Sequence, residues 1–223
     1  MKNSHQYIEF VGVPGAGKTE AAKLFTAELQ DRGEMAHFRE GAGRSVFLKL
    51  WLFPRALFFL RKVPKVMCSD SFKDAPGVRT VIQNLRWRFA VEAVVVRHLL
   101  SQGALVNDEG LVGKVVALMT LAELSKEDAV QLLRNALPQK SVLVFVNVSI
   151  EIAMKREAVR DIELPFFNNL PPAAKHHFYT KSDELYRTFA SWYGAGAVQV
   201  EYMENNMGRR ELKENVVRLG SKV

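Results

Sequence analysis

The sequence predicts an α/β fold in which a parallel sheet of about five strands lies between two layers of helices, giving a three-layer αβα arrangement. Short apolar segments alternate along the chain with longer segments of helical periodicity, and this alternation is typical of βαβ units. The composition is that of a globular protein, with 48% hydrophobic and 25% charged residues among 223. It excludes a disordered, collagen-like or disulfide-stapled chain. The length fits a single domain over residues 1–223.

Five short apolar segments are expected to form buried strands. They are Tyr7–Val11, Met35–Arg39, Ala104–Asn107, Ser141–Val148 and Ala197–Tyr202. Helices are expected between them, where apolar residues recur three or four positions apart. They are Gly17–Arg32, Val78–Ser101, 125–137, Ile150–Arg160, 171–193 and Gly208–Leu219. Local signals mark several helix ends: Gly33 and Gly103 act as stops, Ser125 can act as an N-cap, and Pro171 opens the last long helix.

A glycine-rich loop follows the first strand and opens the first helix. It matches the pattern G-x-x-x-x-G-K-[ST], in which glycines let the backbone N–H groups point into one concavity and the helix adds its positive end. This P-loop predicts the binding of a nucleoside triphosphate, with Lys18 reaching the β- and γ-phosphates and Thr19 binding Mg²⁺. The expected ATP-binding residues are Gly12, Val13, Pro14, Gly15, Ala16, Gly17, Lys18 and Thr19.

Acidic residues follow two other strands, where a parallel sheet places its ligands. Asp108 comes after the strand 104–107 and is the expected Mg²⁺ partner, while Glu109 is a second metal-shell group or a water activator. Glu40 follows the strand 35–39 and could accept a proton from an attacking hydroxyl, and the adjacent Arg39 could hold an anionic acceptor. The sequence leaves open whether Glu40 or the Asp108/Glu109 pair is the base.

Two arginines lie four residues apart on the helix after the strand 141–148. This spacing puts Arg156 and Arg160 on one helix face, where their charges could stabilise a phosphoryl group in transfer. The following segment, 161–175, contains three prolines and suits a mobile lid that excludes water. We therefore expect a lid over about 155–178.

The order of these features resembles the thymidylate kinase and deoxynucleoside kinase branch of the P-loop kinases. The segments that carry the resemblance are GVPGAGKT, FREGAG, SQGALVNDEG, SVLVFVNVSIEIAMKREAVR and VQVEYMENN. It implies a P-loop NTPase fold with a five-stranded sheet and a helical lid, ATP and Mg²⁺ as cofactors, and transfer of the γ-phosphate to an acceptor.

The same resemblance implies roles for individual residues. Arg39 and Glu40 match the segment that contacts the acceptor, with Gly41 where the family has proline, and Glu40 matches the base of the deoxynucleoside kinases. Arg156 and Arg160 match the lid arginines. Glu109 stands where the family has arginine. An acceptor-side helical insertion is expected over about 44–100, and the adenine near 203–206.

The segment 46–65 is strongly apolar and also basic. It is interrupted by Pro54 and is too short to span a bilayer. Three interpretations fit it: a buried helical hairpin bent at Pro54, an interface between two copies, or a surface for anionic lipid or a lipid-like acceptor. Its cations contribute to the formal net charge of +7, which calls for an anionic partner.

Three functions are compatible with a P-loop: a small-molecule kinase, a regulatory switch NTPase, and a nucleic-acid-binding ATPase. A GTPase switch would carry D-x-x-G after a strand together with N-K-x-D. Residues 74–77 match the first motif but follow no strand, and N-K-x-D does not occur. No interleaved aromatic and basic platform indicates nucleic acid. The single cysteine, Cys68, favours a reducing cytoplasmic setting, with a peripheral membrane contact as an option through 46–65.

Overall fold

The computed structural model describes residues 6–39, 46–159, 170–192, 198–206 and 209–221. Within these ranges a parallel sheet forms from β1 (Tyr7–Val11), β2 (Ala36–Arg39), β3 (Ala104–Asn107), β4 (Ser141–Asn147) and β5 (Val198–Glu204). The strand order is β2-β3-β1-β4-β5, so β1 lies in the centre. The expected strands are confirmed with ends shifted by at most two residues. Because the strands are parallel, their carboxyl ends meet at one edge.

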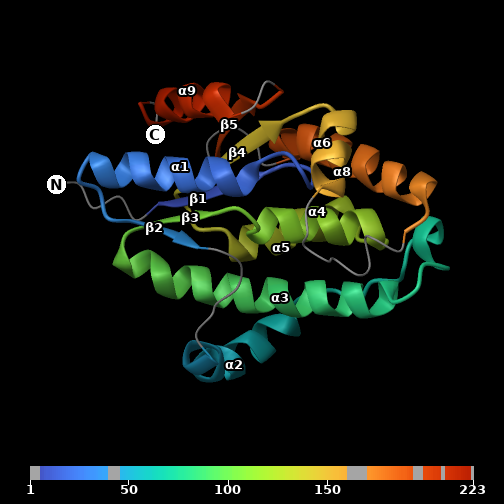
Figure 1. Cartoon of the computed structure of the whole chain (residues 1–223). Helices are drawn as coiled ribbons and strands as arrows, with labels where there is room; N and C mark the ends of the chain where they lie inside the picture. Colours follow the sequence, from blue (N-terminus) through green and yellow to red (C-terminus); the bar gives the residue numbers. More distant parts are fainter. Residues whose placement is uncertain (1–5, 40–45, 160–169, 193–197, 207–208, 222–223) are drawn as a thin grey trace.

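Helices cover both faces of this sheet (Figure 1). On one side lie α1 (Lys18–Asp31) and α9 (Arg209–Gly220), and on the other lie α3 (Val78–Leu99), α4 (Leu111–Leu121) and α5 (Lys126–Ala136). Beyond α3 lies α2 (Val46–Leu60), while α6 (Ile150–Ala158) and α8 (Pro172–Trp192) gather near the carboxyl ends of the strands. Short 3-10 turns occupy Asp70–Phe72 and Leu100–Gln102. This confirms the three-layer arrangement.

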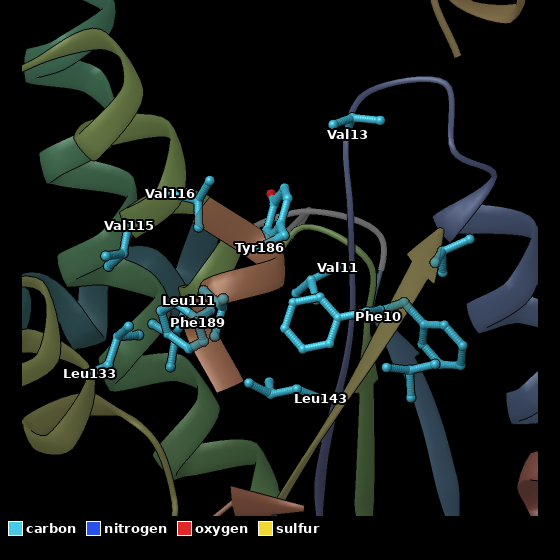
Figure 2. Packing of buried hydrophobic residues seen from close by; sticks show 14 of the residues in the cluster. Phe10, Val11, Val13, Leu111, Val115, Val116, Leu133, Leu143, Tyr186 and Phe189 are labelled. Atoms are coloured by element: carbon cyan, nitrogen blue, oxygen red, sulfur yellow. The ribbon is translucent and has the colours of Figure 1, made fainter. Parts of the chain in front are cut away.

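The core lies where α4 and α8 pack against the central strands (Figure 2). Leu111 of α4 and Phe189 of α8 are fully buried and lie beside Val11 of β1 and Leu143 of β4. Phe10 of β1 packs on the other face, where its ring centroid lies 5.6 Å from that of Phe25 of α1. Continuous apolar runs in β1 and β4 are expected for strands that are covered on both faces. This packing fixes the position of the loops that leave the carboxyl ends of both strands.

Two elements differ from the sequence-based expectation. α4 was not anticipated: the segment 111–121 is buried on nearly every side, so its apolar residues show no single helical face. The hairpin bent at Pro54 is wrong, because α2 continues as one helix through Pro54, and its outer side chains are exposed. Among the described residues, no helix combines the length and the apolar character needed to cross a membrane.

Candidate active site

The P-loop connects β1 to α1 and has the geometry of a phosphate cradle. Gly15 has a φ of 76°, and a Cβ at this residue would overlap the backbone carbonyl of Ala153 on α6. Only glycine fits such a position, because it has no Cβ and tolerates positive φ. Lys18 begins α1 and donates from Nζ to the carbonyl of Val13 across the loop, at 2.9 Å. Its cation therefore lies over the concavity that the sequence predicts for phosphate.

Asp108 and Thr19 meet beside this loop. The Thr19 hydroxyl donates a hydrogen bond to the Asp108 carboxylate, which is only 5% exposed. Its Oδ1 atom is buried and accepts no hydrogen bond from the described residues. Burial, which is opposed by the Thr19 hydrogen bond and reinforced by Glu109, raises the pKa of Asp108. A buried oxygen without a donor, next to a hydroxyl, fits Mg²⁺, because this ion is usually held by one or two protein oxygens together with phosphates and water.

A buried polar network holds the turn that carries Asp108. Asn107 donates to Glu92 Oε1 of α3 at 2.8 Å and accepts the N–H of Glu109 at 3.2 Å. Lys114 of α4 lies 3.9 Å from Glu92 Oε2 and donates to the carbonyls of Glu109 and Gly110. Both charged side chains are buried, so each offsets part of the desolvation of the other. The network directs the turn towards the P-loop.

A second buried carboxylate, Glu9, lies on β1 beneath the same turn. It accepts hydrogen bonds from the Tyr7 hydroxyl at 2.8 Å and from the N–H groups of Val112 and Gly113 at 3.1 and 3.0 Å. These N–H groups belong to the first turn of α4, where an anion offsets the helix dipole. Burial raises the pKa of Glu9, although all three hydrogen bonds oppose the shift. A side chain at Gly110 would collide with Tyr7 and Glu9, so this glycine permits the close approach.

A cavity of about 740 Å³ opens beside the phosphate cradle. Lys18, Asp108 and Glu109 border it at the P-loop end. Its walls are mostly apolar, and α3 contributes a row of polar side chains at helical spacing: Thr80, Asn84 and Arg88. Lys114, Ser182 and Tyr186 line it as well. The cavity has the size and composition of a small-molecule site.

Arg156 lies next to the turn that follows β5. Its Nη1 donates to the carbonyl of Asn205 at 3.1 Å, and the Asn205 side chain in turn donates to the carbonyl of Ala16 in the P-loop, at 2.7 Å. Asn205 also donates from its backbone N–H to Asn147 at the end of β4. Arg156 is therefore linked to the P-loop through Asn205, and it is not among the described residues that line the cavity. Its role on the transferred phosphoryl group stays a prediction.

Other predicted site residues fall outside the described ranges. They are Glu40, Arg160 and the side chain of Arg39. The backbone of Arg39 ends β2 in register with Asn107 of β3. The chain therefore leaves β2 at the edge of the sheet where Asp108 follows β3.

Several residues of this site were not anticipated from the sequence: Tyr7, Glu9, Glu92, Lys114 and Tyr186. Asn205 lies in the segment 203–206, where the resemblance places the adenine. The available signal was a charged residue within an otherwise apolar pattern, which applies to Glu9 in YIEFV and to Glu92 in α3. Tyr186 gave no such signal. Its hydroxyl accepts the N–H of Gly12, and burial raises its pKa well above the usual value. It links α8 to the start of the P-loop.

The Asp108→Asn variant should be more stable than the parent while losing activity. The raised pKa means that, above the unfolded-state value near 4, folding carries a cost for the ionised carboxylate, and we expect the variant to have a higher free energy of unfolding than the parent at pH 7.5. The folded state binds more protons between the two pKa values, so its stability falls as pH rises through that range. Urea titrations should show a higher free energy of unfolding for Asp108→Asn than for the parent at pH 7.5, and no difference at pH 4.

The exposed Glu123→Gln variant is the matched control and should change neither stability nor activity. A loss of stability in Asp108→Asn at pH 7.5 would show that Asp108 is held by partners that favour its charge.

Comparison with known proteins supports the fold. No family model matches the sequence, and no curated protein does. Among solved structures, this chain is similar to a deoxyadenosine kinase from M.mycoides with bound dATP, with a TM-score of 0.55 and 10% sequence identity. The match covers 97% of this chain and 98% of that one. The chain thus has the P-loop kinase fold over nearly its whole length, as its resemblance to that branch implied.

Proposed function

We propose that this protein is an ATP-dependent kinase that transfers the γ-phosphate of ATP–Mg²⁺ to a small-molecule acceptor. The observation that carries this proposal is the cavity of about 740 Å³ that begins at Lys18 and Asp108. A P-loop that only hydrolyses ATP needs room for a water molecule, whereas this cavity has room for a second reactant beside the phosphates. One cysteine, which is free, fits a cytoplasmic enzyme.

The residues of the site supply most of what phosphoryl transfer requires. The backbone N–H groups of the P-loop and Lys18 bind the phosphates of ATP and stabilise the charge that develops on them. Thr19 and Asp108 would hold Mg²⁺, which would supply further neutralisation of the phosphate charge. Arg156 and Arg160 would add cations from the lid side. The buried network around Glu92 keeps Asp108 in place when the substrates bind.

The bond between the γ-phosphorus and the bridging oxygen breaks, ADP leaves, and a new bond forms to the acceptor oxygen. When the acceptor is a hydroxyl, its proton passes to a carboxylate. Glu40 is our preferred base because it directly follows β2, whose end lies in register with the β3 residue that precedes Asp108. Glu109 is the alternative, since it is exposed and borders the cavity.

The cavity favours an acceptor with an apolar or planar body and a few polar groups. Apolar side chains form most of its wall, while Asn84 and Arg88 offer donors at separate points. A nucleoside or nucleotide satisfies this description, and the similar structure is that of a deoxyadenosine kinase. Glu109 stands where the family that the sequence resembles has arginine. The phosphate of a nucleotide acceptor would therefore have to be bound by other cations, such as Arg88.

A regulatory P-loop NTPase without an acceptor is the second candidate. Arg156 of α6 donates to Asn205, which donates to Ala16 of the P-loop, and Tyr186 of α8 accepts the N–H of Gly12. These contacts favour the second candidate, because they connect the P-loop to the two helices on either side of the segment 160–169. Such a protein would hydrolyse ATP at a rate that no acceptor changes, and it would bind a partner in a nucleotide-dependent way.

Screening ATP consumption against nucleosides, nucleotides, sugars and lipid-soluble alcohols separates the two candidates. We expect one class of acceptor to accelerate ADP release and to become phosphorylated. With that acceptor, Glu40→Gln should lower kcat by about 10²–10³-fold because the proton loses its base, while ATP affinity stays unchanged. Glu34→Gln, an exposed residue before β2, is the control. Normal turnover in Glu40→Gln would transfer the role to Glu109, and ATP turnover insensitive to every acceptor would support the regulatory candidate.

A further inference from the structure

The excess of basic over acidic residues in this protein is concentrated in one segment. The chain has 31 Lys and Arg against 24 Asp and Glu. Residues 41–69 contain six of these basic residues and no acidic one, so the rest of the chain is nearly balanced, with 25 against 24. The cations that surround the phosphate cradle are thus offset elsewhere, and the net charge of +7 belongs almost entirely to the segment that contains α2.

The outer face of α2 is apolar and exposed. Leu52, Ala56 and Phe59 are buried towards α3, where the Phe59 ring lies 6.0 Å from that of Phe89. Leu57 and Phe58 project from the other side and are 42% and 63% exposed. Phe53, which is 47% exposed, lies at the edge of this side, with its ring centroid 5.4 Å from that of Trp87 of α3. Helical spacing places these three side chains on one face.

Met67, which is 72% exposed, follows in the segment after the helix. Four of the eight exposed large hydrophobic side chains in the described ranges thus lie between residues 53 and 67.

Basic side chains border this face. Arg61, Lys62 and Lys65 follow the end of α2 and are all exposed, and Lys62 Nζ lies over the Phe58 ring at 5.4 Å from its centroid. Long cationic side chains beside aromatic and aliphatic ones suit the boundary between lipid headgroups and acyl chains, because the apolar part enters the bilayer while the charge stays among phosphates. Figure 1 shows α2 as the outermost helix beyond α3, on the opposite side of α3 from the sheet.

We propose that the outer face of α2, with the basic residues that follow it, docks this protein on an anionic membrane surface. Phe53, Leu57 and Phe58 would enter the headgroup boundary, and Arg61, Lys62 and Lys65 would pair with acidic lipid headgroups. The inference goes beyond the proposed kinase function and does not depend on it, since none of the described residues of α2 lines the cavity.

The charge and the apolar side chains of this face distinguish an anionic membrane from two other partners, a second copy of the chain and nucleic acid. A second copy in a two-fold contact would bring the same positive segment against itself, and residues 41–69 offer no carboxylate to relieve the repulsion. Nucleic acid would satisfy the cations but would leave Phe58 and Leu57 exposed to water. An anionic bilayer accommodates both the charge and the apolar side chains.

Vesicle co-sedimentation of the full-length protein tests the proposal. We expect binding to vesicles of phosphatidylcholine with 30% phosphatidylserine to be at least tenfold stronger than binding to phosphatidylcholine alone, and to weaken with salt. The double variant Leu57→Ser/Phe58→Ser should lose at least tenfold in binding to the anionic vesicles. Neutralising Arg61, Lys62 and Lys65 to Gln should lose a similar amount.

The matched controls are Val217→Ser, which is an exposed apolar residue of α9, and the exposed Lys213→Gln on the same helix. Both should bind like the parent. Circular dichroism melts establish that the variants are folded, and because the altered side chains are exposed we expect unchanged melting temperatures. Three results would overturn the proposal: no preference for anionic vesicles, binding unaffected by Leu57→Ser/Phe58→Ser, or a lipid-free dimer that dissociates in that variant.

Discussion

Lys18→Ala should abolish phosphoryl transfer while leaving the protein folded. Lys18 begins α1 beneath the P-loop and points its ammonium group across the loop to the Val13 carbonyl. In the bound state the same group would exchange this carbonyl for phosphate oxygens, where the charge develops during transfer. We expect kcat to fall by about 10³-fold or more, because no other described residue bordering the cavity offers a cation at this position. Single-turnover measurement of ADP formation provides the test.

Two controls make the result specific. Lys213→Ala removes an exposed lysine on α9 that does not border the cavity, and it should leave kcat unchanged. Lys18→Arg keeps the charge but changes its shape, so it should retain part of the nucleotide affinity and little of the turnover. A Lys18→Ala variant with kcat within tenfold of the parent would refute the assignment of this loop as the phosphate site.

Glu9→Ala should be the most destabilising single substitution in the site. It would leave the Tyr7 hydroxyl and the N–H groups of Val112 and Gly113 buried without their acceptor. Each buried donor without a partner costs about 1–3 kcal/mol, so we expect a loss of about 3–5 kcal/mol in free energy of unfolding. The midpoint of urea denaturation should fall accordingly, with the slope of the transition unchanged.

Tyr7→Phe is the graded comparison. It removes one donor to Glu9 and the acceptor that the N–H of Leu111 uses at 3.3 Å, while it keeps the aromatic packing. We expect it to cost about 1–2 kcal/mol, clearly less than Glu9→Ala. If Glu9→Ala proved no more costly than Tyr7→Phe, the two N–H groups of α4 would have other partners, such as water, and Glu9 would not be the anchor of that helix.

Features with a local signature could be predicted from the sequence. The P-loop is encoded in eight consecutive residues, and β1 and β4 are short apolar runs of the length that is typical of buried strands. Asp108 could be placed because it directly follows a strand, and strand ends in a parallel sheet share an edge. These predictions depend on a few neighbouring residues, which is why the structure confirms the positions of the elements so closely.

Features that depend on distant partners could not be predicted. Glu9 sits in the apolar strand YIEFV, and the groups that satisfy it lie about a hundred residues later, in α4. α4 itself is buried on nearly every side, so its sequence shows no amphipathic period. The spacing of Arg156 and Arg160 predicts a shared helix face, which stays a prediction because Arg160 lies outside the described residues. The contact that Arg156 makes is with Asn205, which follows β5. The spacing of residues in the sequence predicts which side chains lie on the same face of one helix or strand. It does not predict which helices and strands contact one another.

The central place of β1 has a consequence for how this protein is made. The strand that carries the P-loop pairs with β3 on one side and with β4 on the other, and neither exists until residues 104–107 and 141–147 have been synthesised. The loop is completed later still, because Asn205 supplies the donor to Ala16. At a synthesis rate of roughly 5–20 residues per second, the last contact follows the loop by about ten to forty seconds. Until residues 104–107 and 141–147 have been made, the nascent chain exposes an apolar strand with unpaired edges, and the contact between Asn205 and the P-loop forms only when translation is nearly complete.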